Sequence, residues 1–158
     1  MRNGGYFAVI GEILEYFLSP TGKVRRPNMM NALAQSLLWF HEGCRESVML
    51  MGIVKFSASM EALAVGKEDR GIRRVINARL KIKDEAPIRP EGPTMKQVIE
   101  QIYKPGRSRT IHGTNNKLGH DWTVTRGIAE QLARLCIMSC IEWVGNNPLS
   151  DDPAQLAQ

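Results

Sequence analysis

The chain has 158 residues, of which 43% are hydrophobic and 23% charged, and its formal net charge is +5 at pH 7. This length supports one compact domain with a hydrophobic core, and the composition argues against wholesale disorder. The charge is uneven, because residues 67–89 carry eight Lys or Arg against four Asp or Glu, and residues 96–109 carry four against one. Such a basic excess suits a polyanion such as nucleic acid, although a solvated basic face has the same composition.

The first half of the chain predicts three helices. Residues 6–18 repeat apolar side chains at a spacing of three and four, which predicts an amphipathic helix. Its core-facing stripe is Phe7, Ile10, Leu14 and Phe17. A basic loop, residues 21–27, follows, and Asn31 is suited to cap a second helix. The inner face of that helix is predicted to carry Leu33, Leu37, Phe40 and Cys44. The apolar, proline-free run at residues 48–65 predicts the central helix.

Charges in the two most apolar segments argue against membrane signals. Glu12 and Glu15 interrupt residues 6–18, so we expect no signal peptide there. Lys55 and Glu61 lie within residues 47–65, where each charge would be costly in hydrocarbon. We therefore expect buried helices of a soluble bundle and no membrane partner.

A basic surface helix and a loop follow. Residues 68–82 carry an apolar stripe with arginines around it, which predicts a helix with a basic outer face. The stripe is Ile72, Val75, Ile76 and Leu80. Residues 84–93 contain three prolines and a glycine, and because proline removes a hydrogen-bond donor and fixes the backbone, this segment is predicted to be a loop.

Two further helices complete the predicted fold. Thr94 and Gln97 resemble a capping box that opens a helix, which Pro105 and Gly106 are expected to end or kink. The last strong helix is expected at residues 123–144, and the polar residues after Gly145 are expected to fray. One face of that helix is predicted to carry Ile128, Leu132, Leu135, Cys136, Ser139 and Trp143.

These elements predict an all-α fold, because no segment shows the alternating pattern of a strand and no repeat is found. We expect a single-domain helical bundle of four to six helices. Its parts are an N-terminal helix and basic loop at residues 1–29, the main helical domain at residues 30–145, and a flexible polar tail at residues 146–158.

The cysteines and the absence of known sequence motifs argue against several classes of metal and cofactor site. Cys136 and Cys140 lie four apart on a predicted helix, a spacing that suits core packing, and with Cys44 they make an odd number. The sequence contains no zinc spacing, disulfide framework, Walker loop, dinucleotide fingerprint or paired-histidine motif. We therefore expect a cytoplasmic protein with no metal and no cofactor.

The sequence GRSRTIHG, residues 106–113, is the strongest candidate for chemistry. It combines Arg107, Ser108, Arg109 and His112 within six positions. Arginine offers a planar fork to phosphate oxygens, and histidine exchanges its proton near neutral pH, so together they suit binding or cleavage of a phosphodiester. A basic helix start that ends in a capped histidine explains the same residues without any function. His41 and His120 are weaker candidates, since each lacks such surroundings.

The segment formed by Tyr103, Arg107–Ser108 and His112–Gly113 resembles the Arg-x4-His signature of the HEPN superfamily, in particular its Apea-like branch. Upstream, residues 38–40 and 59–63 are similar to the aromatic helix and the Glu-Ala-Leu helix of the same branch. The resemblance covers roughly residues 30–145. In this branch the tyrosine more often lies three residues before the arginine, whereas Tyr103 lies four before Arg107.

The resemblance implies a HEPN-like helical domain that forms a homodimer, with the two Arg-His motifs at a shared cleft. In many members such a domain is a metal-independent endoribonuclease. His112 would act as general base or acid and Arg107 would stabilise charge on the phosphate, with Ser108 orienting either group. Glu61 is a candidate partner for Arg107 or Arg109, although an exposed glutamate at a helix end is an equal alternative. Arg109 and Tyr103 would support the site.

Two functions remain open from the sequence. The first is an RNA-cleaving dimer in phage defence or a toxin, partnered by an antitoxin or an associated defence protein. The second is a catalytically silent HEPN module that binds nucleotide or RNA, or that serves as a dimerisation domain. Relatives in this branch often form the C-terminal part of a longer protein, which leaves open whether this chain is a whole protein.

Overall fold

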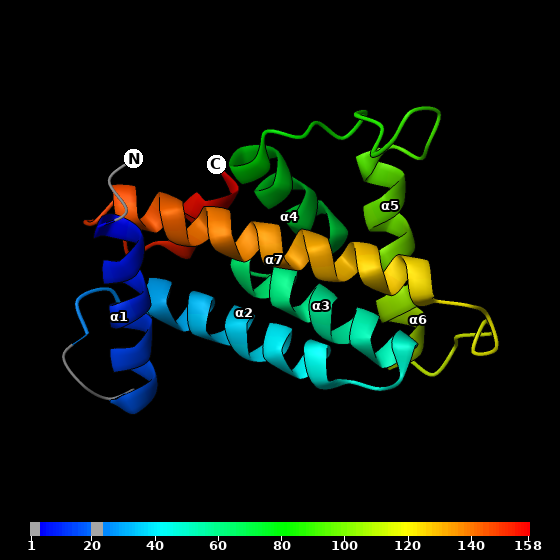
Figure 1. Ribbon diagram of the computed structural model, residues 1–158, viewed down its shortest axis with the longest axis horizontal. Coiled ribbons are helices and arrows are strands. Elements are labelled where there is room, and N and C mark those ends of the chain that lie inside the picture. The colour runs from blue at the N-terminus through cyan, green and yellow to red at the C-terminus, as the bar shows by residue number, and fades with distance from the viewer. Residues whose placement is uncertain (1–3, 20–23) are drawn as a thin grey trace.

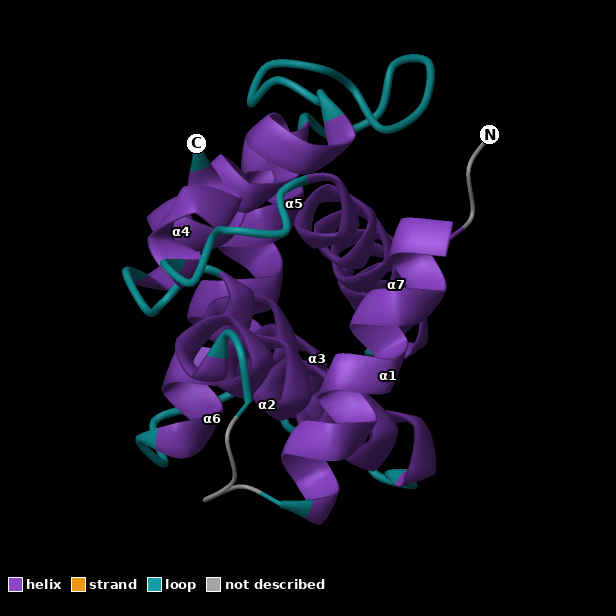
Figure 2. Ribbon diagram, turned by 90° about the vertical axis from the view of Figure 1, so that its left-hand side faces the viewer, coloured by secondary structure: helices purple, strands orange, loops and turns teal. Residues whose placement is uncertain are grey.

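The computed structural model describes residues 4–19 and 24–158, and over these ranges the chain is helical with no strand. Figure 2, coloured by secondary structure, shows helices joined by loops throughout the part described. The elements are α1 (Gly4–Leu18), α2 (Pro27–Arg45), α3 (Met49–Leu63), α4 (Glu68–Val75), η1 (Ile76–Leu80), α5 (Met95–Gln101), η2 (Ile102–Ser108), α6 (Arg109–Ile111), α7 (Thr123–Asn146) and η3 (Pro153–Ala157).

Several of these elements are continuous. The π-helical η1 extends α4, and the π-helical η2 joins α5 to α6, so we call Glu68–Leu80 the α4–η1 rod and residues 95–111 the α5–α6 rod. With α1, α2, α3 and α7 the described residues then form six long helical pieces, followed by the short 3-10 helix η3. The predicted all-α bundle of four to six helices is confirmed.

Helix α3 lies at the centre of the bundle, as predicted, and packs against both α2 and α7. In Figure 1, α7 runs along the long axis, α1 crosses one end of the bundle and the α5–α6 rod stands at the other. The side chains of Ile53, Phe56, Met60 and Leu63 on α3 are fully buried or nearly so. The hydrophobic core of the bundle is therefore built around α3.

The inward face of α1 differs from the prediction except at Ile10, which packs against the core. Val9 and Ile13 are buried, whereas Phe7, Leu14 and Phe17 are 67%, 57% and 49% exposed. Apolar residues surround α1, so spacing alone does not select a face. The choice follows from Gly5, which lies so close to Gly145 of α7 that an added Cβ would be 3.0 Å from its carbonyl oxygen. This contact turns the stripe of Gly5, Val9 and Ile13 inward.

Helix α2 begins at Pro27, four residues before the predicted cap. Proline suits the first helical position, where its missing N–H has no partner to lose. Asn31 lies within the helix, and its Oδ1 accepts a hydrogen bond from the Tyr16 hydroxyl at 2.9 Å. Cys44 is exposed, contrary to the prediction, because the buried Gly43 beside it packs under the Phe56 ring. The predicted loop at residues 21–27 lies partly outside the described residues.

The α4–η1 rod and the loop after it match the predictions. Ile72, Val75 and Ile76 are buried and Leu80 packs against the core. Thr94 opens α5 with a full capping box, in which its hydroxyl accepts from the Gln97 N–H while the Gln97 side chain accepts from the Thr94 N–H. The predicted core positions of Cys136 and Cys140 are also confirmed.

Arginines tie both ends of the chain to the bundle. Arg26 is 2% exposed and its guanidinium donates to both carboxylate oxygens of Glu12, at 2.7 and 2.9 Å, and to the carbonyl of Val144 at 2.9 Å. Arg79 donates to the carbonyls of Gln155 and Leu156. Leu156 is fully buried, so the segment expected to fray instead packs through η3 against the core.

Within the described ranges, no single helix is long and apolar enough to cross a membrane. Helix α3 and the α4–η1 rod pass that test only as a pair, bent by 68°.

Candidate functional site

The α5–α6 rod carries most of the predicted site. The sequence predicts that Pro105 and Gly106 end or kink this helix, and the rod does not end there. The rod passes through Pro105 as the π-helix η2 and continues to Ile111. A π turn is wider than an α turn, which makes room for a proline that lacks an N–H. Gly106 packs against α3 so closely that a Cβ would lie 2.7 Å from Ile53 Cγ2. Arg107 therefore lies inside a helix that is pressed onto the central one.

Asn115 closes the loop that follows the rod, a role that the sequence analysis missed. Its side-chain amide donates to the Pro105 carbonyl and to the Thr110 hydroxyl, both at 2.8 Å. The Thr110 hydroxyl in turn donates to the Gly106 carbonyl at 2.6 Å. These bonds hold the loop after His112 against η2. The signal in the sequence was an amide side chain ten residues after Pro105, where the helix is expected to end or kink.

Arg107, Tyr103 and Glu61 form a closed cluster, which we call the Arg107 cluster. The Arg107 Nη2 pairs with the Glu61 carboxylate, and its Nη1 donates to the Tyr103 hydroxyl at 3.2 Å. That hydroxyl donates to the second Glu61 oxygen, also at 3.2 Å. The guanidinium carbon lies 5.2 Å from the centre of the Tyr103 ring. Glu61 thus pairs with Arg107, one of the two partners that the sequence predicts, and Tyr103 joins them.

The cluster is largely shielded from water. The side chains of Arg107 and Glu61 are 21% and 16% exposed, and Tyr103 is buried. Burial, followed by the nearby Glu61 charge, raises the pKa of Tyr103 to about 12. Tyr103 therefore keeps its proton at neutral pH and serves as a hydrogen-bond donor to Glu61. Arg107 is held in one orientation at the surface of α3.

His112 lies just after the rod and takes no part in that cluster's hydrogen bonds. It is exposed, and its backbone N–H donates to the Ser108 carbonyl at 3.1 Å. Gly113 follows in the left-handed conformation, with φ of +67°, which ends the helix. Within residues 4–19 and 24–158 no hydrogen bond or ion pair joins the His112 side chain to Arg107. The chain thus places a fixed cation and an accessible imidazole at the end of one rod without linking them.

The remaining predicted residues lie around this end. Ser108 is half-buried on η2, and Arg109 on α6 is exposed. Among the described residues, neither side chain has an ion pair or a side-chain hydrogen bond. Arg109 therefore remains open to solvent beside His112, whereas Arg107 is committed to Glu61.

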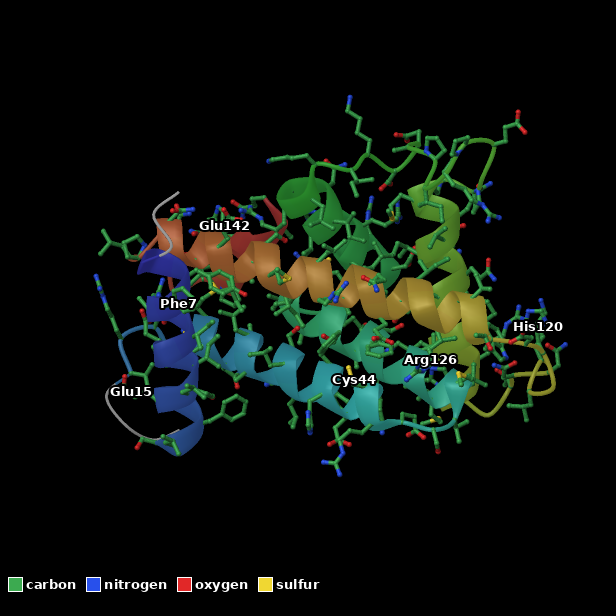
Figure 3. The ribbon with its side chains drawn as sticks, in the orientation of Figure 1. Phe7, Glu15, Cys44, His120, Arg126 and Glu142 are labelled. Carbon is green, nitrogen blue, oxygen red and sulfur yellow. The ribbon has the colours of Figure 1, made fainter. Side chains whose placement is uncertain are left out.

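His120, one of the two weaker candidates, lies in the loop before α7. His120 packs edge-on against Trp122, with ring centres 5.2 Å apart, and Figure 3 shows it at the end of the molecule opposite α1. Hydrogen bonding to the Thr123 side chain, and then to the Thr123 N–H at 2.9 Å, lowers the pKa of Asp121. The Asp121 carboxylate thus accepts a hydrogen bond from the first residue of α7. His41 is exposed on α2 and lies beside Arg45.

Arg126 is a largely buried arginine that was not among the residues predicted from the sequence. Its Nη2 donates to the carbonyls of Gly43 and Glu46, at 3.2 and 3.4 Å, and its guanidinium lies 5.6 Å from the Phe56 ring centre. Figure 3 shows Arg126 on α7 near the junction of α2 and α3. It ties the start of α7 to the end of α2 and has a structural role.

In the part of the chain that the structure describes, no group of three or more His, Cys, Asp or Glu side chains is placed to hold a metal ion. Comparisons of the chain with protein-family models, with curated proteins and with solved structures found no match.

Proposed function

We propose that the chain is a HEPN-like endoribonuclease that cleaves RNA without a metal ion, with Arg107 and His112 as its catalytic residues. The observation that supports this most is the fixed Arg107, held by Glu61 and Tyr103, on the same rod that ends at the exposed His112. The motif resemblance supplies the reaction type. The proposal includes a homodimer in which two such rods form one cleft for single-stranded RNA.

Arg107 is suited to stabilise charge on a phosphate. Each Nη atom of a guanidinium carries two N–H groups, and only one on each is engaged by Glu61 and Tyr103. The remaining N–H groups are free to donate to phosphate oxygens. Glu61 and Tyr103 hold the guanidinium in place before substrate arrives, which avoids reorganisation during the reaction.

His112 is suited to move the protons. As general base it takes the proton of the ribose 2′-hydroxyl, whose oxygen then attacks the adjacent phosphorus. The bond from phosphorus to the 5′-oxygen breaks, and that oxygen receives a proton from an imidazolium, supplied by the second His112 in the proposed dimer. The products are a 2′,3′-cyclic phosphate and a 5′-hydroxyl. Ser108 orients the phosphate, and the exposed Arg109 attracts the RNA backbone.

Cleavage of single-stranded RNA in the presence of EDTA tests the assignment. We expect wild-type protein to cleave and His112→Ala to lose at least about a hundredfold in rate, the usual contribution of a general acid or base. His120→Ala is the matched control, since it removes another exposed histidine from the same loop and should keep wild-type activity. Equal cleavage by wild type and His112→Ala would refute the assignment.

We further propose that the activity serves phage defence or acts as a toxin, with an antitoxin or an associated defence protein as partner. Expression in a bacterial host should then slow growth for the wild type and not for His112→Ala, with both proteins at equal abundance. Equal growth of the two strains, despite active purified enzyme, would count against a toxin.

One observation favours a second candidate function, a catalytically silent HEPN module that binds nucleotide or RNA or only dimerises. Glu61 neutralises much of the Arg107 charge, and His112 is not bonded to it. In that case wild-type protein would not cleave RNA, and RNA binding would survive His112→Ala.

A further inference from the structure

The outer face of the α4–η1 rod carries a cluster of arginines that shares no residue with the Arg107 cluster. Arg70, Arg73 and Arg74 line a hollow of about 450 Å³, together with Asn77 and Asp84. The C-terminal residues Ala157 and Gln158 close one side of it. Ile72, Val75 and Ile76 of the same rod point into the core, so the arginines occupy the opposite face. The hollow is a polar site at the surface of the bundle.

The three arginines are not equivalent. Arg73 donates to Asp84 and pairs with Asp69, so two carboxylates fix its position. Arg70 and Arg74 are exposed, and among the described residues no carboxylate pairs with either of them. The residues that line the hollow include three arginines and one acid, Asp84, which pairs with Arg73. The excess positive charge in the hollow therefore belongs to Arg70 and Arg74.

Helix stability does not account for this placement. Cations stabilise the last turn of a helix, but η1 continues α4 without a break, so Arg70 lies in the first turn of the rod and Arg74 at its middle. They are also spaced at i and i+4, where like charges repel one another. An anion bound between them relieves that repulsion.

We propose that this hollow, which we call the α4 pocket, binds a phosphorylated ligand between Arg70 and Arg74, with the Asn77 amide as a further donor. Its volume falls in the range of small-molecule sites and is sufficient for a nucleotide. Guanidinium groups bind phosphate oxygens through paired N–H groups. The residues that line the pocket are mostly polar or charged, which suits a charged ligand better than an apolar one. The phosphate comes from a free nucleotide or from an RNA backbone. The proposal does not depend on the RNA-cleaving role of Arg107 and His112.

Binding measurements on the full chain test the α4 pocket. The probes are ATP and a short single-stranded RNA that is 2′-O-methylated and lacks terminal phosphates, so that it cannot be cleaved at the 2′-position. Both are titrated by calorimetry at low salt in EDTA. We expect Arg70→Gln/Arg74→Gln to bind at least one probe about tenfold more weakly than wild type, because two charge-assisted contacts are lost.

The controls separate this site from general charge and from the proposed catalytic site. Arg25→Gln/Arg45→Gln removes the same charge from other exposed positions and should bind both probes like wild type. A loss for ATP alone identifies a free nucleotide as the source, a loss for RNA alone identifies the RNA backbone, and a loss for both shows that the pocket accepts either. The proposal is overturned if neither probe binds wild type, or if the Arg70/Arg74 variant binds both like wild type. A cleavage assay of the same variant at saturating RNA reports on His112 independently.

Discussion

The guanidinium of Arg107 lies between a carboxylate and a tyrosine hydroxyl, and this arrangement sets what the residue can do. The sequence predicts Glu61 as a partner of Arg107 or Arg109, with an exposed glutamate as an equal alternative. The choice between the two arginines could not be predicted, because it depends on how η2 turns Arg107 toward α3 while Arg109 faces solvent. The exposure of His112 likewise depends on where the rod ends.

A double-mutant cycle measures how strongly Glu61 holds Arg107. We expect Glu61→Gln and Arg107→Gln to show a coupling energy of about 1–3 kcal/mol in urea unfolding, since the pair is largely shielded from water. The Glu100–Lys104 pair on the same rod is the control, because its lysine is 61% exposed. Its coupling should stay below about 0.5 kcal/mol. Equal coupling for the two pairs would show that Arg107 is not fixed.

Tyr103 gives the cluster a dependence on alkaline pH. Its pKa is raised to about 12 in the folded chain, above the ordinary value of 10.0, so folding favours the protonated form. This contribution to stability is complete below about pH 10 and is lost as the pH rises toward 12. Tyrosinate absorbance of wild type minus Tyr103→Phe should titrate near 12. A difference curve centred at 10 would mean that Tyr103 is accessible to water.

At the scale of helices, periodicity predicts where they lie better than how they are turned. Helix α3 and the capped start of α5 follow directly from an apolar run and a capping box. The face of α1 does not, because its apolar residues surround the helix and the Gly5–Gly145 contact decides between them. The passage of the rod through Pro105 also could not be predicted, since it depends on π geometry and on the fit of Gly106 against Ile53.

A pair of glycine substitutions tests that fit. Gly106→Ala places a Cβ 2.7 Å from Ile53 Cγ2, so we expect a loss of about 1–3 kcal/mol in the free energy of unfolding. Gly127→Ala in α7 meets nothing within 4 Å and should instead stabilise by about 0.5–1 kcal/mol, because alanine is the better helix former. Both are measured by urea unfolding. A neutral Gly106→Ala would show that η2 does not press on α3.

The whole molecule is held together by contacts that join distant parts of the sequence. An all-α bundle could be predicted from the absence of strand patterns, but the docking of the C-terminal segment could not. Its polar composition suggests fraying, whereas one buried residue, Leu156, and the two hydrogen bonds from Arg79 hold it in place. Arg26 plays the same part for α1, through Glu12 and the end of α7.

Neighbouring arginines allow a matched test of that contact. Arg26→Met leaves the Glu12 carboxylate and the Val144 carbonyl without their donor, so we expect a loss of about 2–4 kcal/mol in the free energy of unfolding. Arg25→Met removes the same charge from an exposed position and should change stability by less than about 0.5 kcal/mol. Equal losses of unfolding free energy in the two variants would mean that the change in net charge, and not the buried contact, is responsible.

The central claim is that the end of the α5–α6 rod cleaves RNA through the ribose 2′-hydroxyl. The most direct measurement is the chemical form of the product ends, determined by mass spectrometry after incubation of single-stranded RNA with wild-type protein in EDTA. We predict 2′,3′-cyclic phosphate and 5′-hydroxyl ends, and no cleavage at a position carrying a 2′-deoxy substitution. Products with 5′-phosphate ends, or cleavage that continues past the 2′-deoxy substitution, would contradict the account.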